Sequence, residues 1–231
     1  ELETERLLTT PRHYAYLKIS EGCNWKCGYC AIPLIRGPHV SVPMETLLEE
    51  ARKLAARGVR EIMVIAQDTT YYGIDLYGRR RLAELLTALC RIDDIEWIRL
   101  HYAYPTAFPD DVIDVMASEP KICKYLDIPF QHISDRMLTA MKRRHTKADA
   151  LALIERLRER IPDIALRTTL LVGYPTETEQ DMQELEQFVR DVRFDRLGVF
   201  AYSEEEGTYS ARELRDDVPE EEKQRRVDRI M

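Results

Sequence analysis

Apolar residues follow two alternating patterns along the chain. Short apolar runs of strand type are separated by longer segments in which apolar residues return every three or four positions, as on one face of a helix. The runs predict six strands, at 15–19, 62–66, 97–102, 125–128, 166–172 and 197–202. Because strands that alternate with helices form parallel sheets, we predict an α/β fold with a parallel sheet whose faces are covered.

The helical segments carry recognisable start and stop signals. The first has Ser41 as a candidate N-cap, Pro43 in its first turn and Gly58 at its end. A second helix is expected at about 80–91. Further helices are expected to start near four residues: Pro109, Ser134, Thr146 and Thr178.

The number of strand–helix units limits the architecture. Six units are two short of a closed eightfold barrel, and right-handed crossovers would curl such a sheet. We therefore predict an open, partial (β/α)6 barrel with parallel strands. The expected organisation is a lead-in at 1–14, a core at 15–210 and a C-terminal linker and helix at 211–231.

Composition and charge narrow the class of protein. The 231 residues are 45% hydrophobic and 32% charged, as in an ordinary globular protein, and the net charge of −7 argues against binding nucleic acid through the whole surface. No apolar run approaches the roughly 18 residues of a membrane span, and no secretory signal is present, so we expect a cytoplasmic protein without a membrane partner. The first residue is not Met and the last residues form an interrupted charged helix, so we expect a piece of a longer protein.

Three of the five cysteines lie within eight residues, at Cys23, Cys27 and Cys30. An odd, clustered count is typical of a reducing compartment rather than of a disulfide framework. The loop follows the first strand, at the end of a barrel where active sites lie. Three thiolates can hold three irons of a 4Fe–4S cluster and leave the fourth iron open to a substrate or cofactor.

Structural zinc is the alternative interpretation of this loop. Zinc takes four ligands, of which His39 could be the fourth, but no second cysteine pair follows. A zinc-stabilised binding module without catalysis is kept as the alternative function. We expect Cys90 and Cys123 to be buried core residues, because free cysteine packs as a small hydrophobic side chain.

The spacing C-x3-C-x2-C, with Tyr29 before its last cysteine, resembles the signature of the radical S-adenosylmethionine (SAM) enzymes. The resemblance implies that the open iron binds the amino and carboxylate groups of SAM, and that cleavage of SAM yields a 5′-deoxyadenosyl radical. Tyr29 matches the aromatic residue that packs near the adenine in that family.

Further segments resemble the methylthiotransferase branch of these enzymes: 20–23, 31–37, 127–132 and 171–178. Two others, 66–77 and 199–208, resemble its RimO type. The resemblance implies an enzyme that adds a methylthio group to the β-carbon of an aspartate in a small-subunit ribosomal protein. The MiaB-type enzymes, which modify an adenosine of transfer RNA, are the alternative within the branch.

The resemblance also suggests which residues contact SAM. Gln67 and Asp68 fall where the family meets the methionyl amino group, and Gly173 falls where backbone approaches the adenine. Family members usually carry a glycine where this sequence has Thr176. We also place Gln131 among the cofactor-binding residues.

Arg167 and Thr169 lie on one face of the fifth predicted strand. A buried arginine needs an anionic partner, which is either the SAM carboxylate or a barrel carboxylate such as Asp127. His132, next to Gln131, either lines the site or has a structural role.

The basic run at 142–145 could contact ribosomal RNA or an acidic loop, although a solvated helix end is the more usual explanation. The resemblance further implies a second 4Fe–4S cluster in an N-terminal domain, a C-terminal TRAM domain and an electron donor such as flavodoxin or ferredoxin. The expected partner is the ribosomal protein or the ribosome, and the oligomeric state stays open.

Overall fold

The computed structural model describes residues 7–231, and residues 1–6 of the predicted lead-in lie outside this description. Six parallel strands form one sheet in the order β1-β4-β5-β6-β7-β8. Their bounds are Tyr14–Lys18, Glu61–Ile65, Trp97–Leu100, Ile122–Asp127, Ala165–Val172 and Arg196–Ala201. All six predicted strands are thus confirmed, and the largest difference at a strand start is in β6, which begins at Ile122.

A small antiparallel hairpin of β2 (Ser20–Glu21) and β3 (Val40–Ser41) was not predicted. Ser41 belongs to this hairpin, and both its backbone N–H and its hydroxyl donate to Asp75. The prediction that Ser41 caps the following helix is therefore wrong, because its polar groups are already used. Helix α2 (Met44–Ala56) begins after Pro43 instead.

Ten α-helices and one 3-10 turn (Thr69–Tyr71) lie in the described part of the chain. Besides α2, the helices are α1 (Ile32–Arg36), α3 (Ile74–Tyr77), α4 (Leu82–Cys90), α5 (Asp110–Ser118), α6 (Asp135–Ala140), α7 (Lys147–Arg160), α8 (Glu179–Val192), α9 (Tyr209–Glu213) and α10 (Glu220–Ile230). The four predicted helix starts are confirmed as N-caps. Thr146 and Thr178 form complete capping boxes, which satisfy the first N–H groups of α7 and α8.

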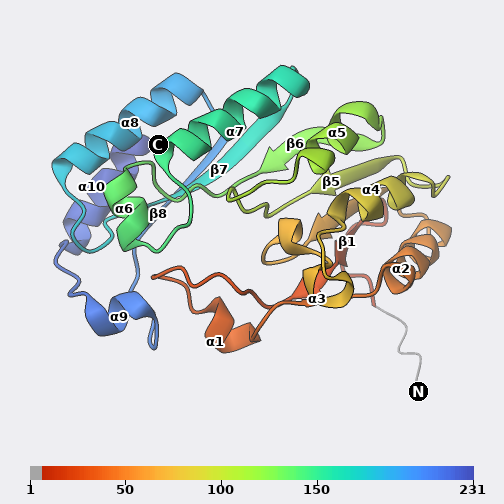
Figure 1. Cartoon of the computed structure of the whole chain (residues 1–231), viewed down its shortest axis with the longest axis horizontal. Coiled ribbons are helices and arrows are strands. Elements are labelled where there is room, and N and C mark those ends of the chain that lie inside the picture. The colour runs from red at the N-terminus through yellow and green to blue at the C-terminus, as the bar shows by residue number, and fades with distance from the viewer. Residues whose placement is uncertain (1–6) are drawn as a thin grey trace.

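The larger helices form an arc around the outside of the curved sheet, and β1 and β8 are its two edge strands (Figure 1). Alternate strand residues point to the two faces, so Ala15 and Leu17 are fully buried toward the helices. Tyr16 and Lys18, which alternate with them, are exposed on the inner face. The sheet is an open, partial barrel as predicted. The expectation that both faces are covered is wrong for the inner face, because the inward residues of β1 and several of those of β7 are exposed or only partly buried in the open barrel.

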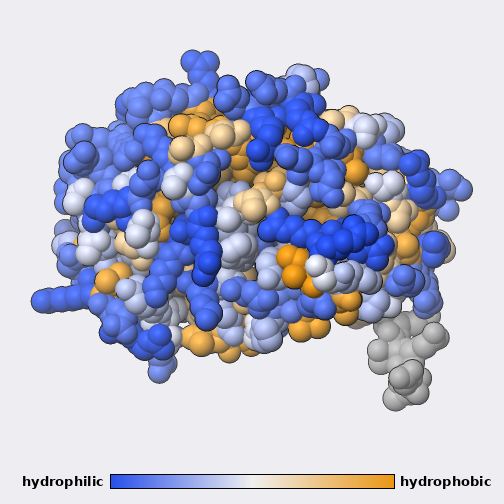
Figure 2. Space-filling view, viewed as in Figure 1, coloured by the Kyte–Doolittle hydropathy of each residue, from blue (hydrophilic) through white to orange (hydrophobic). Residues whose placement is uncertain are grey.

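The visible surface is mainly hydrophilic (Figure 2). Hydrophobic residues gather at its lower edge, where Figure 1 places α1, whose Leu34 and Ile35 are exposed. None of the helices within residues 7–231 combines the length and the apolar character needed to cross a membrane. Cys90 is buried as predicted, whereas Cys123 is only partly buried beside Arg99.

Candidate functional site

The cysteine loop connects the hairpin strand β2 to α1 at the carboxyl end of β1. Gly22 opens the loop with φ +76°, and a Cβ atom there would lie 2.1 Å from the carbonyl oxygen of Pro38. The loop is fixed by backbone hydrogen bonds from Cys23 to Gly37 (3.1 Å) and from Gly28 to Met141 (2.8 Å). The close approach at Gly22 requires glycine, so local sequence and tertiary contacts together set the position of the loop.

Cys23, Cys27 and Cys30 are free thiols, and all three are partly buried. Burial raises the pKa of Cys23 to about 11 and raises the pKa of Cys30 as well. In residues 7–231, no group of three or more His, Cys, Asp or Glu side chains is placed to hold a metal ion. An iron–sulfur cube takes its thiolates on different irons, so its ligands need not converge on one point.

His39, the candidate fourth ligand of zinc, uses one ring nitrogen in a contact with β3, while Nδ1 has no hydrogen-bond partner. Its side chain is buried, and Nε2 lies 3.0 Å from the hydroxyl of Ser41 in β3. Its backbone N–H donates to the side chain of Asn24 (3.1 Å). His39 therefore supports the base of the loop.

The aromatic ring of Trp25, inside the cysteine loop, stacks on a second ring from outside the loop. Trp25 stacks on Tyr104 with ring centroids 4.1 Å apart and 7° between the planes. The indole N–H of Trp25 donates to Asp68 Oδ2 at 2.7 Å. Asp68 is buried and its other oxygen accepts from Thr70 (2.9 Å). Asp68 therefore contacts the cysteine loop through Trp25, and both of its carboxylate oxygens accept hydrogen bonds from the protein.

A cavity of about 390 Å³ opens next to the cysteine loop, at the carboxyl ends of β1 and β4. It is lined by Lys18, Ile32, Ile65, Ala66, Gln67 and Tyr102. Gln67 reaches it from the loop after β4, and its amide Nε2 donates to Glu21 at 3.0 Å. The cavity and the cysteines thus share one end of the sheet, where parallel α/β folds bind their ligands.

The inner face of β7 carries Arg167 and Thr169, as predicted. Arg167 Nη1 donates to Asp127 Oδ1 at 2.7 Å and to Thr169 Oγ1 at 3.2 Å. Of the two partners left open by the sequence, the structure contains the carboxylate of Asp127. Gln131 stands beside them with φ +70°, and its backbone N–H donates to Thr169 at 2.9 Å.

The turn after β7 begins at Gly173, with φ +71°. Its N–H donates to Glu177 Oε2 at 2.7 Å, and the same carboxylate oxygen accepts from Arg226 of α10 at 2.6 Å. A Cβ atom at Gly173 would meet Lys223 Cγ at 2.4 Å, so the close approach at this glycine is made by α10.

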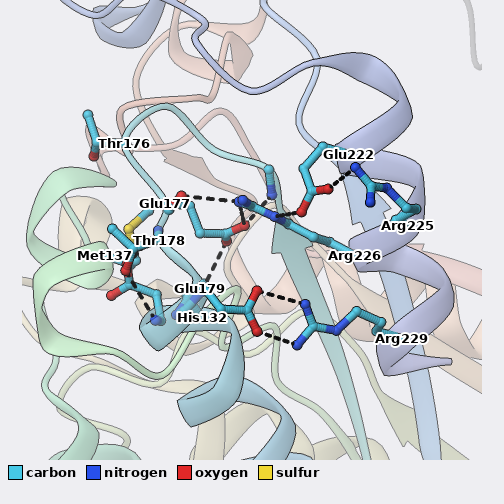
Figure 3. Close-up of polar contacts among 12 residues, drawn as sticks. His132, Met137, Thr176, Glu177, Thr178, Glu179, Glu222, Arg225, Arg226 and Arg229 are labelled. Carbon is cyan, nitrogen blue, oxygen red and sulfur yellow. Dashed lines mark hydrogen bonds and ion pairs between the residues drawn. The ribbon is translucent and has the colours of Figure 1, made fainter.

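His132 is fully buried and lies beside Glu177 of this network (Figure 3). Its Nδ1 accepts the N–H groups of Ile133 and Ser134, so Nε2 carries the ring proton. That nitrogen lies 3.2 Å from Glu177 Oε1. Of its two possible roles, His132 has the structural one.

The basic run at 142–145 is not a solvated helix end. Arg143 and His145 are buried, and burial together with Arg143 lowers the pKa of His145 to about 4. Arg143 Nη1 lies 3.5 Å from Cys27 Sγ and 3.4 Å from the hydroxyl of Tyr29. The predicted surface role of the run is therefore wrong for Arg143 and His145, because the chain turns sharply after α6.

Sequence reasoning missed Trp25, Tyr104, Arg143 and Glu177 as parts of the site. Arg143 and Tyr104 come from loops far from the cysteines in sequence, so no local spacing links them. Glu177 carried a usable signal, since it follows Gly173 by four residues in a turn. The tryptophan inside the cysteine loop was a second available signal.

A comparison with known protein families assigns most of the chain, including the cysteine loop, to one superfamily. The model of the Radical SAM superfamily matches residues 17–189, so the chain belongs to that superfamily. Membership implies a 4Fe–4S cluster and SAM as cofactors. The match extends from β1 through most of α8 and therefore includes the cysteine loop, the cavity and the turn at Gly173.

Curated relatives are similar over the whole chain. The Bacteroides thetaiotaomicron protein named ribosomal protein uS12 methylthiotransferase RimO is 57% identical over 231 residues. A Porphyromonas gingivalis protein of the same name is 59% identical over the same length. In both cases 100% of this chain aligns with 53% of the relative, so the chain spans about half the length of these proteins.

Solved structures share the fold at low sequence identity. Coproporphyrinogen III oxidase (HemN) from Escherichia coli aligns with a TM-score of 0.65 and 20% identity, over 94% of this chain and 50% of that one. Methylornithine synthase (PylB) gives 0.63 and 14% identity, over 94% of this chain and 61% of that one. These likenesses concern the fold alone.

Proposed function

We propose that this chain is the radical SAM part of an enzyme that attaches a methylthio group to the β-carbon of an aspartate in ribosomal protein uS12. The observation that carries the proposal is the cysteine loop beside an open cavity, in a chain similar throughout to proteins named uS12 methylthiotransferase. Cys23, Cys27 and Cys30 would each bind one iron of a 4Fe–4S cluster.

The donor set fits such a cluster. A thiol whose pKa is raised by burial, as in Cys23, stays protonated unless a cation replaces the proton. Metals bind cysteine as thiolate, so iron would release these protons and occupy the loop. When bound, the cluster and SAM together supply a 5′-deoxyadenosyl radical that takes a hydrogen atom from carbon.

We propose the 390 Å³ cavity as part of the space for SAM, since its volume lies within the usual range for small-molecule sites. Gln67 would offer its amide to the methionyl end, and Asp68 would act through Trp25 by holding the loop in place. Tyr29 would pack near the adenine.

The inner face of the sheet would hold the remainder of SAM. One-third of the Arg167 side chain is exposed although it pairs with Asp127, so its free side can meet the SAM carboxylate. Thr169 and the backbone of Gln131 would line this face, and the turn at Gly173, which α10 covers on the side where a Cβ would lie, would bring backbone close to the adenine.

The donated sulfur requires a source besides these three cysteines. Cys90 and Cys123 are the other two in the sequence, which is too few for a second cluster. We propose that the second 4Fe–4S cluster lies outside this sequence, in an N-terminal part of a longer protein. The proposed electron donor is a flavodoxin or ferredoxin, and the proposed macromolecular partner is uS12 free or within the ribosome.

The first test is anaerobic reconstitution of the 231-residue chain with iron and sulfide, followed by electron paramagnetic resonance after reduction. We expect a 4Fe–4S signal that changes on addition of SAM and disappears in Cys23→Ala, Cys27→Ala and Cys30→Ala. Cys90→Ala is the matched control and should keep the signal, because Cys90 is buried in α4.

The reduced protein should also cleave SAM, which chromatography would detect as 5′-deoxyadenosine. A colourless protein with zinc bound by thiolates and no cluster signal would contradict the proposal. Cluster loss in Cys90→Ala but not in Cys27→Ala would contradict the proposed ligand set.

A further inference from the structure

Arg143 is a buried cation beside the cysteine loop. It follows α6 in a tight turn, where Lys142 has φ +55° and the Arg143 N–H donates to Leu138 at 2.8 Å. This turn directs the side chain inward, and only 8% of the residue is exposed. The guanidinium carbon lies 4.2 Å from the centroid of the Tyr104 ring.

The polar contacts of Arg143 do not neutralise its charge. Nη2 donates to the carbonyl of Pro129 at 2.6 Å, and Nη1 lies 3.4 Å from Tyr29 and 3.5 Å from Cys27 Sγ. Nε has no hydrogen-bond partner. Within residues 7–231, no carboxylate forms an ion pair with this side chain.

Two other arginines, Arg167 of β7 and Arg226 of α10, have the carboxylate partner that Arg143 lacks. Arg226, with 10% of its side chain exposed, binds Glu177 at 2.6 Å, and Arg167 binds Asp127 at 2.7 Å. A buried charge without a counter-ion is strongly unfavourable, so burial of Arg143 requires an anion nearby. The nearest group able to become an anion on metal binding is the thiol of Cys27.

We propose that Arg143 is the counter-ion of the iron–sulfur cluster and raises the potential at which the cluster accepts an electron. This proposal rests on the proposed ligation of the cluster by Cys27. Reduction adds one electron, supplied by a one-electron donor, with no bond broken and no proton taken up. The reduced state carries one more negative charge, so a nearby cation and an N–H donor to the ligand sulfur stabilise it preferentially.

The shape of arginine explains why this residue type is used. Its planar group reaches Pro129, Tyr29 and Cys27 at once while one face covers Tyr104. A lysine would keep the charge but could not reproduce this fork or the stacking. Arg143 is therefore a positioning and charge-setting residue that acts through the Cys27 ligand.

The test is a redox titration of the reconstituted 231-residue chain with dithionite, monitored by electron paramagnetic resonance in the absence of SAM. In Arg143→Met we expect at least a tenfold lower ratio of reduced to oxidised cluster at a given potential, equivalent to about 59 mV for one electron. Arg143→Lys should give a smaller decrease. Arg144→Met is the matched control, because the neighbouring Arg144 is exposed, and its titration should follow the native one.

Iron and sulfide content separates the outcomes. An unchanged potential in an Arg143→Met protein with a full cluster would overturn the inference and leave the cluster proposal intact. A folded Arg143→Met protein that loses its iron, while Arg143→Lys keeps it, would support the need for a charge. Loss of iron from both variants would overturn the inference, since Arg143 would then matter for its shape alone. Absence of a cluster in the native chain would refute the proposed function itself.

Discussion

Two residues of the turn after β7 have left-handed backbone conformations, Gly173 with φ +71° and Thr176 with φ +73°. Glycine adopts this conformation without steric cost, whereas a β-branched residue is strained there. Contacts hold Thr176 in place, since its N–H donates to Asp217 at 3.0 Å and its carbonyl accepts from Arg136 at 2.7 Å. Thr176 therefore has the left-handed backbone conformation that is usual for glycine.

We expect Thr176→Gly to stabilise the chain by about 0.5–1 kcal/mol, because relief of left-handed strain outweighs the flexibility of glycine in the unfolded chain. Urea denaturation monitored by circular dichroism measures this change. Gly173→Ala is the opposing control and should destabilise, since its Cβ would meet Lys223 Cγ at 2.4 Å. A destabilised Thr176→Gly variant would show that the threonine side chain is needed at this position.

At the scale of elements, the start of α8 is tied to the start of α6 through one carboxylate. Asp181 closes the capping box with Thr178 and also accepts from Ser134, the N-cap residue of α6, at 2.7 Å. Arg136 of α6 pairs with the same carboxylate. Burial by itself raises the pKa of Asp181, but hydrogen bonds from Arg136, Thr178 and Ser134 hold it well below the ordinary value.

This lowered pKa predicts a pH-dependent contribution to stability. The contribution is fully present above the unfolded pKa of about 3.9 and is lost as the pH falls through that value toward the lower folded pKa. We expect the free energy of unfolding of Asp181→Asn to depend less on pH than that of the native chain between about pH 5 and pH 3. Urea titrations at several pH values measure this, and parallel curves for the two proteins would contradict the prediction. Asp191→Asn, at the other end of the same helix, is the control.

At the scale of the whole molecule, α10 connects the end of the described chain to the site. Arg226 crosses from α10 to Glu177, whose carboxylate also holds the N–H of Gly173, while His132 lies on its other side (Figure 3). The Glu177 side chain is fully buried, so this ion pair is shielded from solvent. The last helix thus takes part in shaping a turn of the barrel mouth.

Arg226→Met should destabilise the chain by about 3 kcal/mol, because it leaves a buried carboxylate without its cation. Arg225→Met is the matched control on the same helix. Its side chain is 73% exposed and pairs with Glu222, so we expect a change below about 1 kcal/mol. Chemical denaturation of both variants measures the difference, and equal effects would contradict a special role for the buried pair. Combining Arg226→Met with Glu177→Gln should recover part of the loss.

The predicted and observed structures agree best where a signal is local. The positions of the six strands, the helix starts at Thr146 and Thr178, and the shared loop of Cys23, Cys27 and Cys30 all follow from periodicity, capping and spacing. Ser41 was misassigned because a hydroxyl before a helix can serve either as a cap or in a strand. In the structure the hydroxyl of Ser41 donates to Asp75, and the sequence pattern does not show that Asp75 lies nearby.

The sequence by itself thus determined the class of fold, the position of the cysteine loop at the carboxyl end of the first strand and the superfamily. Only the tertiary structure shows which charged side chains contact one another. Whether Arg167 faces Asp127, whether Arg143 is buried beside Cys27 and whether α10 reaches Glu177 depend on segments far apart in the chain. Strand and helix periodicity reflects contacts with near neighbours and the burial of one face, whereas ion pairs inside the fold depend on how several elements pack together.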